Sequence, residues 1–67
     1  MHEINELKAI LFENCEFWEN AYEETSKSFG KLSFQAERNY LRYFALYDVI
    51  TEANLEKEFE VWKEQNK

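Results

Sequence analysis

The residues with the most evident chemistry in this chain are polar side chains, mostly carboxylates, that recur at helical spacing near the N-terminus. Glu6, Glu13, Glu16, Asn20 and Glu23 follow one another at intervals of three, four or seven positions. Side chains at these intervals share one face of an α-helix, so the spacing predicts a continuous polar stripe. Carboxylates on a rigid helix can mimic a row of phosphates and so occupy a basic nucleic-acid-binding groove on a partner protein. The alternative interpretation is an ordinary solvated face.

The charge balance sets this stripe apart from the rest of the chain. The net charge is −6, and residues 1–26 carry seven acids against Lys8 alone, which gives 1 − 7 = −6. Residues 27–67 carry seven acids and seven bases and are neutral as a group. An acidic surface is a poor direct ligand for nucleic acid, whose phosphates select a basic one. We therefore expect a protein partner with a basic surface and no direct contact with nucleic acid.

A different grouping of acids suggests metal chemistry. The pattern Glu13-x-x-Glu16-x-x-Glu19, set against Asp48-x-x-x-Glu52, resembles in part the all-helical magnesium-dependent nucleotide hydrolases, which hold the ion between acidic pairs. This resemblance implies a magnesium-dependent enzyme as a remote alternative. The sequence departs from the paired Glu-Glu-x-x-Glu and Glu-x-x-Asp patterns of those families. We expect no metal and no cofactor.

The sequence offers no constellation for nucleophilic catalysis. Cys15 is the only cysteine and His2 the only histidine, and His2 stands at the chain terminus. Cys15 falls beside an apolar seam, which predicts a small buried hydrophobe. A single thiol cannot form an internal disulfide, and charged residues follow Met1 where a leader would be apolar. These features indicate a reducing cytoplasm and a protein that is not an enzyme.

Asp48 is an acid outside the stripe that is also a candidate for contact with a partner. On a helical wheel it lies between Leu41 and Phe44, at the edge of an apolar surface, and its i+4 neighbour Glu52 is a second acid. It therefore needs a hydrogen-bond donor from across the fold or from another molecule. We include Asp48 among the candidate partner contacts.

Helices must position all of these residues. The chain has no Pro, one Gly and twelve aromatic residues, a composition with little to interrupt a helix. Apolar residues at steps of three and four predict a helix over about 3–28, with Ile10, Phe12 and Phe17 widening its apolar seam. Gly30 can end that helix in the left-handed conformation, and Ser33 can cap a second helix over about 33–53.

The C-terminal segment predicts a third, shorter helix over about 55–66. Its apolar stripe is Leu55, Phe59 and Trp62, and Thr51 or Asn54 can supply the cap. The alternative is that the second helix continues unbroken to the C-terminus. The expected fold is all-α: an antiparallel helical hairpin with a short C-terminal helix, in one domain spanning 1–67. It is either a three-helix bundle or a dimerising hairpin.

The second helix carries two apolar faces. One is mainly aromatic, made of Tyr40, Tyr43, Phe44, Tyr47 and Ile50. The other is made of Phe34, Leu41, Ala45 and Val49. A helix that is apolar on two sides needs two neighbours, and the first helix covers only one side. We expect Leu41, Ala45 and Val49 to meet either the third helix or a second copy in a homodimer.

These features favour a small non-enzymatic interaction protein. We expect a cytoplasmic regulator, inhibitor or accessory subunit, of bacterial, phage or mobile-element origin, that binds a protein partner. A structural hairpin that self-associates is the alternative. No apolar run approaches the roughly 20 residues of a membrane helix, so we expect no membrane contact.

Overall fold

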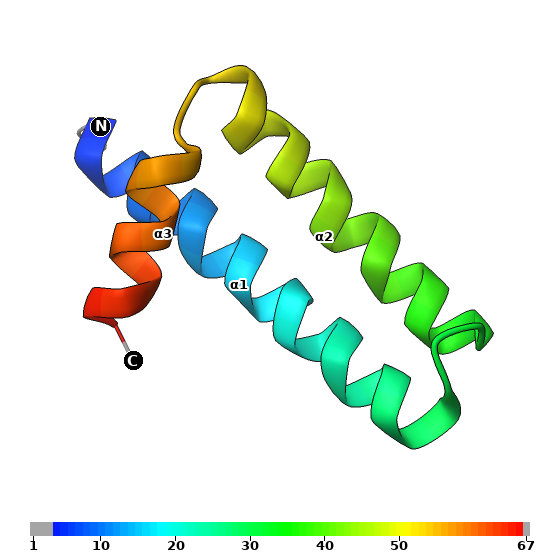
Figure 1. The fold of residues 1–67 in the computed structure, drawn as a ribbon. Helices are drawn as coiled ribbons and strands as arrows, with labels where there is room; N and C mark the ends of the chain where they lie inside the picture. Colours follow the sequence, from blue (N-terminus) through cyan, green and yellow to red (C-terminus); the bar gives the residue numbers. More distant parts are fainter. Residues whose placement is uncertain (1–3, 67) are drawn as a thin grey trace.

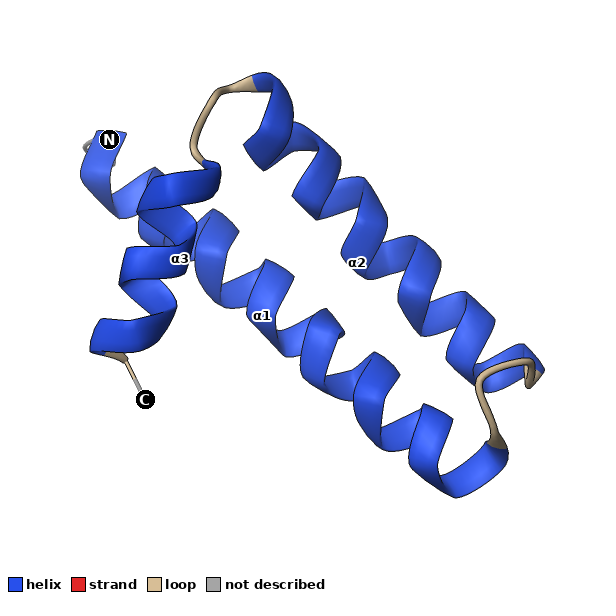
Figure 2. Cartoon of the chain, in the orientation of Figure 1, coloured by secondary structure: helices blue, strands red, loops and turns tan. Residues whose placement is uncertain are grey.

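Three helices and two short loops make up the fold of residues 4–66, which the computed structural model describes. They are α1 (Ile4–Phe29), α2 (Phe34–Glu52) and α3 (Glu56–Gln65). Figure 1 shows α1 and α2 running antiparallel as a long hairpin, with α3 folded back across the N-terminal half of α1. Figure 2 shows that the chain between them is confined to two tight connections. The predicted all-α hairpin with a short third helix is confirmed.

The turn between α1 and α2 forms as its sequence predicts. Gly30 has a φ of 96°, in the left-handed region that closes a helix, and its N–H donates to the carbonyl of Ser26 at 3.0 Å. The Ser33 hydroxyl accepts a hydrogen bond from the N–H of Ala36 at 3.1 Å and so caps α2. The same hydroxyl donates to the carbonyl of Gly30 at 2.7 Å, which ties the turn together.

The connection between α2 and α3 differs from the expectation. Asn54 was expected as a cap for α3, but its φ of 59° makes it the left-handed residue that ends α2. The N–H of Leu55 reaches the carbonyl of Ile50 at 2.9 Å, and the N–H of Asn54 reaches that of Thr51 at 3.0 Å. This pair of bonds is the Schellman motif. The N-cap position of α3 is occupied by Leu55, whose side chain makes no capping hydrogen bond. The prediction that Thr51 or Asn54 caps α3 is therefore wrong.

The core lies where all three helices meet, at the end of the hairpin away from the Gly30 turn. Its fully enclosed members come from each helix: Phe12 and Cys15 from α1, Ile50 from α2 and Phe59 from α3. The rings of Phe12 and Phe59 lie 5.2 Å apart, a distance typical of an aromatic pair. The half-buried residues packed around this centre are Leu11, Tyr43, Leu46, Tyr47, Leu55 and Trp62.

The second apolar face of α2 stays uncovered. Leu41 is 58% exposed and Val49 is 52% exposed, and Ala45 between them is exposed as well. Of the two coverings expected for this stripe, packing of α3 is therefore wrong, whereas a second copy stays a prediction. The stripe Leu55, Phe59 and Trp62 directs α3 instead to the core at the open end of the hairpin. Within the described chain, nothing covers the outer side of α2.

Candidate protein-interaction surfaces

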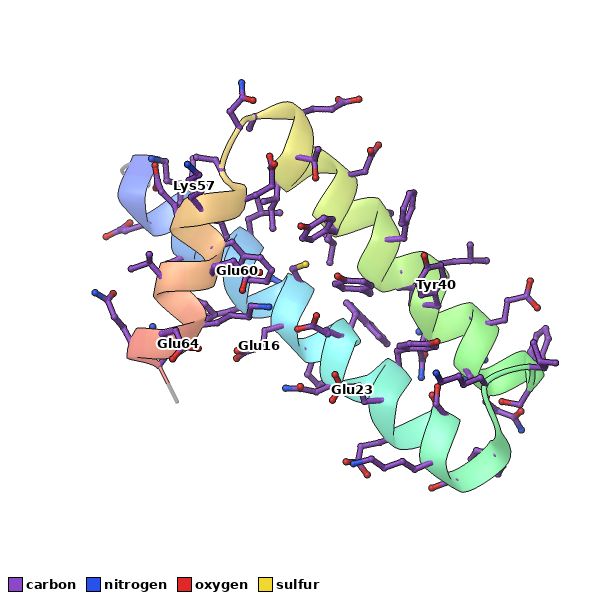
Figure 3. All side chains as sticks on the ribbon, viewed as in Figure 1. Glu16, Glu23, Tyr40, Lys57, Glu60 and Glu64 are labelled. Carbon is purple, nitrogen blue, oxygen red and sulfur yellow. The ribbon has the colours of Figure 1, made fainter. Side chains whose placement is uncertain are left out.

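The acidic stripe predicted on the first helix lies on the surface. Glu6, Glu13, Asn20 and Glu23 are exposed, and Glu16 is partly buried. Figure 3 marks Glu16 and Glu23 on α1, together with Glu60 and Glu64 on α3. The side of α1 that packs on α2 is occupied by apolar residues, so these polar side chains are left to face outward.

Two large apolar residues, Ile10 and Phe17, lie within this polar surface, although the sequence predicts that they are buried. Ile10 and Phe17 were expected to widen the buried seam together with Phe12. Only Phe12 is buried; Ile10 is 43% exposed and Phe17 is 61% exposed. The Phe17 ring stands edge-on to Trp18, with centroids 5.0 Å apart and an interplanar angle of 86°. That contact orients the ring while leaving most of it in solvent.

We call this surface the α1 outer face. Its residues follow one another at steps of three and four along one side of the helix: Glu6, Ile10, Glu13, Phe17, Asn20 and Glu24. It places an exposed aromatic ring between Glu13 and Asn20, with Glu16 and Glu23 at the edge of the face. Sequence reasoning identified the carboxylates but assigned Phe17 to the core, because a wide apolar arc on a helical wheel does not say where the core ends.

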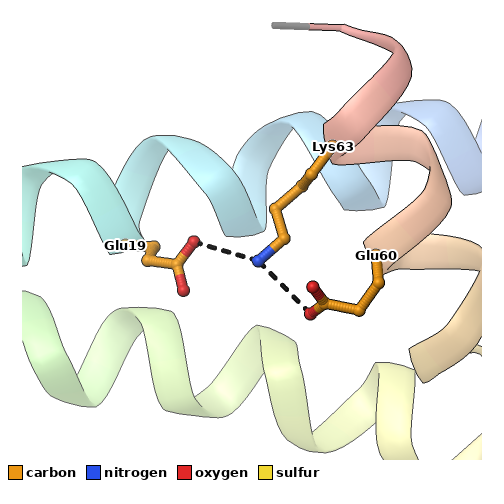
Figure 4. A network of polar contacts seen from close by, with 3 residues as sticks. All are labelled: Glu19, Glu60 and Lys63. Atoms are coloured by element: carbon orange, nitrogen blue, oxygen red, sulfur yellow. Dashed lines mark hydrogen bonds and ion pairs between the residues drawn. The ribbon is translucent and has the colours of Figure 1, made fainter.

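The carboxylate of Glu19 has a structural role. The Nζ atom of Lys63 lies 3.4 Å from Oε1 of Glu19 and 3.3 Å from Oε1 of Glu60, as Figure 4 shows. The ammonium also stands 4.6 Å from the centre of the Phe59 ring. Burial alone would lower the pKa of Lys63, but the charges of Glu19 and Glu60 raise it above its ordinary value.

The magnesium-site pattern is not assembled. Glu19 is engaged with Lys63, while Asp48 and Glu52 are exposed on α2. Across the described part of the chain, no group of three or more Asp, Glu, His or Cys side chains comes close enough to hold a metal ion. The acids that resemble those of the magnesium-dependent hydrolases therefore do not converge.

The charge of Glu19 acts on two groups, Cys15 in the core and Tyr43 packed against it. Burial, and then the charge of Glu19, raise the pKa of the Cys15 thiol to about 11. The same two causes, in the same order, raise the pKa of Tyr43 well above its usual range. Both groups are therefore neutral at physiological pH, where a thiol is a weak nucleophile. The prediction that Cys15 is a small buried hydrophobe is confirmed.

The outer side of α2 forms a second surface, which we call the α2 outer face. It contains the three residues predicted for self-association and their exposed neighbours: Phe34, Arg38, Leu41, Ala45, Asp48, Val49 and Glu52. The Arg38 guanidinium lies 5.8 Å from the centre of the Phe34 ring. Among the residues that the structure describes, Asp48 has no hydrogen bond or ion pair, so the donor expected from across the fold is not there.

A shallow groove of about 430 Å³ separates α1 from α3. Its lining combines apolar residues, among them Phe12, Val61 and Trp62, with the charged residues Lys8, Lys57 and Glu58. The Nζ atom of Lys8 lies 3.2 Å from Oε2 of Glu58, so an ion pair joins the two helices at this groove. Sequence reasoning did not find this groove, because it exists only once α3 is docked on α1.

None of the helices in residues 4–66 combines the length and the apolarity needed to cross a membrane. Comparison of the chain with models of protein families, with curated proteins and with solved structures gave no significant match. The two outer faces described above are therefore the basis for assigning a function.

Proposed function

We propose that this chain is a non-enzymatic interaction protein of the cytoplasm that binds a protein partner through the α1 outer face. The complementary surface on the partner is an apolar pocket that receives the Phe17 ring, with Lys or Arg side chains around it to meet Glu13 and its neighbours. Occupying such a basic surface would make the protein a regulator, an inhibitor or an accessory subunit.

The exposure of Phe17 is the observation that carries this proposal. A helix face that serves only to meet water gains nothing from a large aromatic residue, and aromatic side chains are enriched at the energetic centres of protein interfaces. Around Phe17, at helical spacing, stand Glu13 and Asn20, which suit the polar rim of such an interface.

Electrostatics supports the same surface. The excess negative charge of the chain is confined to residues 1–26, so α1 presents a field of one sign to an approaching molecule. Such a field accelerates encounter with a basic surface and repels an acidic one, and salt screens it over about 8 Å at physiological ionic strength. Charge therefore favours a basic partner, while Phe17 supplies the apolar contact that holds it.

The experiment is capture of partners from extract of the source cells on immobilised protein. The wild type is compared with two variants. Phe17→Ser removes the aromatic ring, and Glu13→Lys reverses a charge on the polar border of the proposed interface. The matched controls are Leu32→Ser, an equally drastic change at a fully exposed apolar residue in the turn, and Glu37→Lys, the same charge reversal on α2.

We expect one captured protein to be lost with both α1 variants and retained with both controls. Its binding should weaken as salt is raised, and more steeply for wild type than for Glu13→Lys. Loss with the controls as well, or retention with Phe17→Ser, would contradict the proposal.

A further inference from the structure

The α2 outer face has a symmetrical sequence pattern centred on Ala45. Four positions before and after it stand two apolar residues, Leu41 and Val49. Seven positions before and after it stand two residues of opposite charge, Arg38 and Glu52. All five are exposed, so the pattern is displayed on the surface.

This pattern is complementary to itself in one orientation. Consider two copies of α2 that pack antiparallel about a two-fold axis at Ala45. A residue that precedes Ala45 by a given number of positions then lies near the partner residue that follows Ala45 by the same number. Leu41 then packs against Val49 of the partner subunit. Arg38 lies opposite Glu52 of the partner subunit. Because both contacts occur twice, one helix face supplies two apolar contacts and two ion pairs.

From this symmetry we infer that the protein forms an antiparallel homodimer through the α2 outer face. The small side chain of Ala45 at the axis lets the two helices approach closely. Arg42 is not part of this face, because its guanidinium lies 4.6 Å from the centre of the Trp18 ring on α1 of the same chain.

A parallel arrangement of the same faces is disfavoured. In a parallel pair, each charged residue of α2 would lie beside the identical residue of the second copy, so that Arg38 meets Arg38 of the partner subunit. It would also align the two helix dipoles, whereas the antiparallel arrangement opposes them.

A second copy suits this face because the acidic helix is kept away from the contact. α1 packs on the opposite side of α2, so docking two α2 outer faces leaves the two α1 helices on the outside of the dimer. Their negative charges are then well separated across the assembly, and repulsion between copies is small. The dimer would present two α1 outer faces pointing in opposite directions.

The inference goes beyond the proposed function and does not depend on it. Dimerisation uses the α2 outer face and partner binding uses the α1 outer face, so the failure of one leaves the other standing. Together they would give a bivalent assembly, whose two α1 outer faces point in opposite directions and can each bind one partner molecule.

The test is the oligomeric state by sedimentation, from about one to one hundred micromolar, for the wild type and four variants. Arg38→Glu and Glu52→Arg each turn both ion pairs into like-charge contacts, and the double variant restores opposite charges with the signs exchanged. Lys57→Glu is the matched control for charge change, since Lys57 is exposed on α3. Helix content by circular dichroism checks that all four variants fold.

We expect a wild-type dimer, a dissociation constant raised on the order of tenfold by each single reversal, and recovery in the double variant. Lys57→Glu should match the wild type. A wild type that stays monomeric across the range overturns the inference. Equal association of the wild type and both single variants overturns it too, since that outcome shows association in another orientation or through another face.

Discussion

The Nζ atom of Lys63 lies 3.4 Å from Oε1 of Glu19, and this contact joins the short third helix to the middle of α1. Both side chains are largely shielded, with exposures of 20% for Lys63 and 26% for Glu19. The charge of Lys63 makes a second contact, because the ammonium also lies 4.6 Å from the centre of the Phe59 ring. An acidic residue of α1 thereby helps to hold α3 in place.

Replacing Lys63 with Met should weaken the docking of α3. The variant keeps most of the apolar stem but loses the ion pair and the contact with the Phe59 ring, so the free energy of unfolding should fall by about 1 kcal/mol. Urea denaturation followed by circular dichroism measures this. Lys57→Met, at an exposed position on the same helix, should change stability by less than about 0.5 kcal/mol; an equal loss in both variants would remove the role given to Lys63.

Stability should decrease as the pH rises above about 9. In the unfolded chain the Cys15 thiol ionises near 9.0, whereas burial and Glu19 raise its pKa in the fold to about 11. A raised pKa of this kind contributes stability that is complete below pH 9 and is lost as the pH rises through the folded value. Tyr43, whose pKa is also raised in the fold, adds a loss that begins near pH 10.

The measurement for this pH effect is the free energy of unfolding from pH 7 to pH 11. Cys15→Ala should flatten the decline between pH 9 and pH 10, even though the variant is less stable overall, and Tyr43→Phe should reduce the decline above pH 10. Identical slopes in the wild type and Cys15→Ala would show that the thiol is not protected in the fold.

Phe59→Ala should be among the most damaging single changes. Phe59 is fully buried and contacts the rings of Phe12 and Trp62, and truncation of a core Phe costs about 3–5 kcal/mol. Such a loss is a large part of the stability of so small a domain. In thermal denaturation, Phe59→Ala should lose the cooperative transition. Val61→Ala, at an exposed position on the same helix, should stay within about 0.5 kcal/mol of the wild-type stability.

Much of the fold was predictable because local sequence determines it. Gly30 and Ser33 carry the signals for a helix end and a helix start, and the chain forms its turn between them. The stripe of Leu55, Phe59 and Trp62 predicted the third helix and the side it buries. These features depend on helical periodicity and on residues with strong backbone preferences.

The position of α3 and the extent of the buried seam were not predictable in the same way. Asn54 can cap a helix or end one, and the choice depends on whether Leu55 finds a place beside Ile50 in the core. Ile10 and Phe17 are as apolar as their buried neighbours. Whether they are covered depends on how far α3 extends over α1, which is a property of tertiary packing.

The two residues with positive φ should respond differently to substitution. Gly30→Ala should cost about 1 kcal/mol through backbone strain alone, because an added Cβ would meet no atom within 4 Å. Asn54→Gly should leave stability unchanged or raise it slightly, since Gly is the preferred residue in a Schellman motif. Thermal denaturation of both variants tests this, and a neutral Gly30→Ala would contradict the role of that turn.

Photo-crosslinking in the source cells measures whether the α1 outer face contacts another protein. Benzoylphenylalanine placed at position 17 puts a reactive group on the α1 outer face, and the same group at position 29 samples an exposed phenylalanine at the far end of α1. We predict a covalent adduct with a second protein from position 17, weakened when Glu13→Lys is added and absent from position 29. No adduct from position 17, or the same adducts from both positions, would contradict a binding role for the α1 outer face.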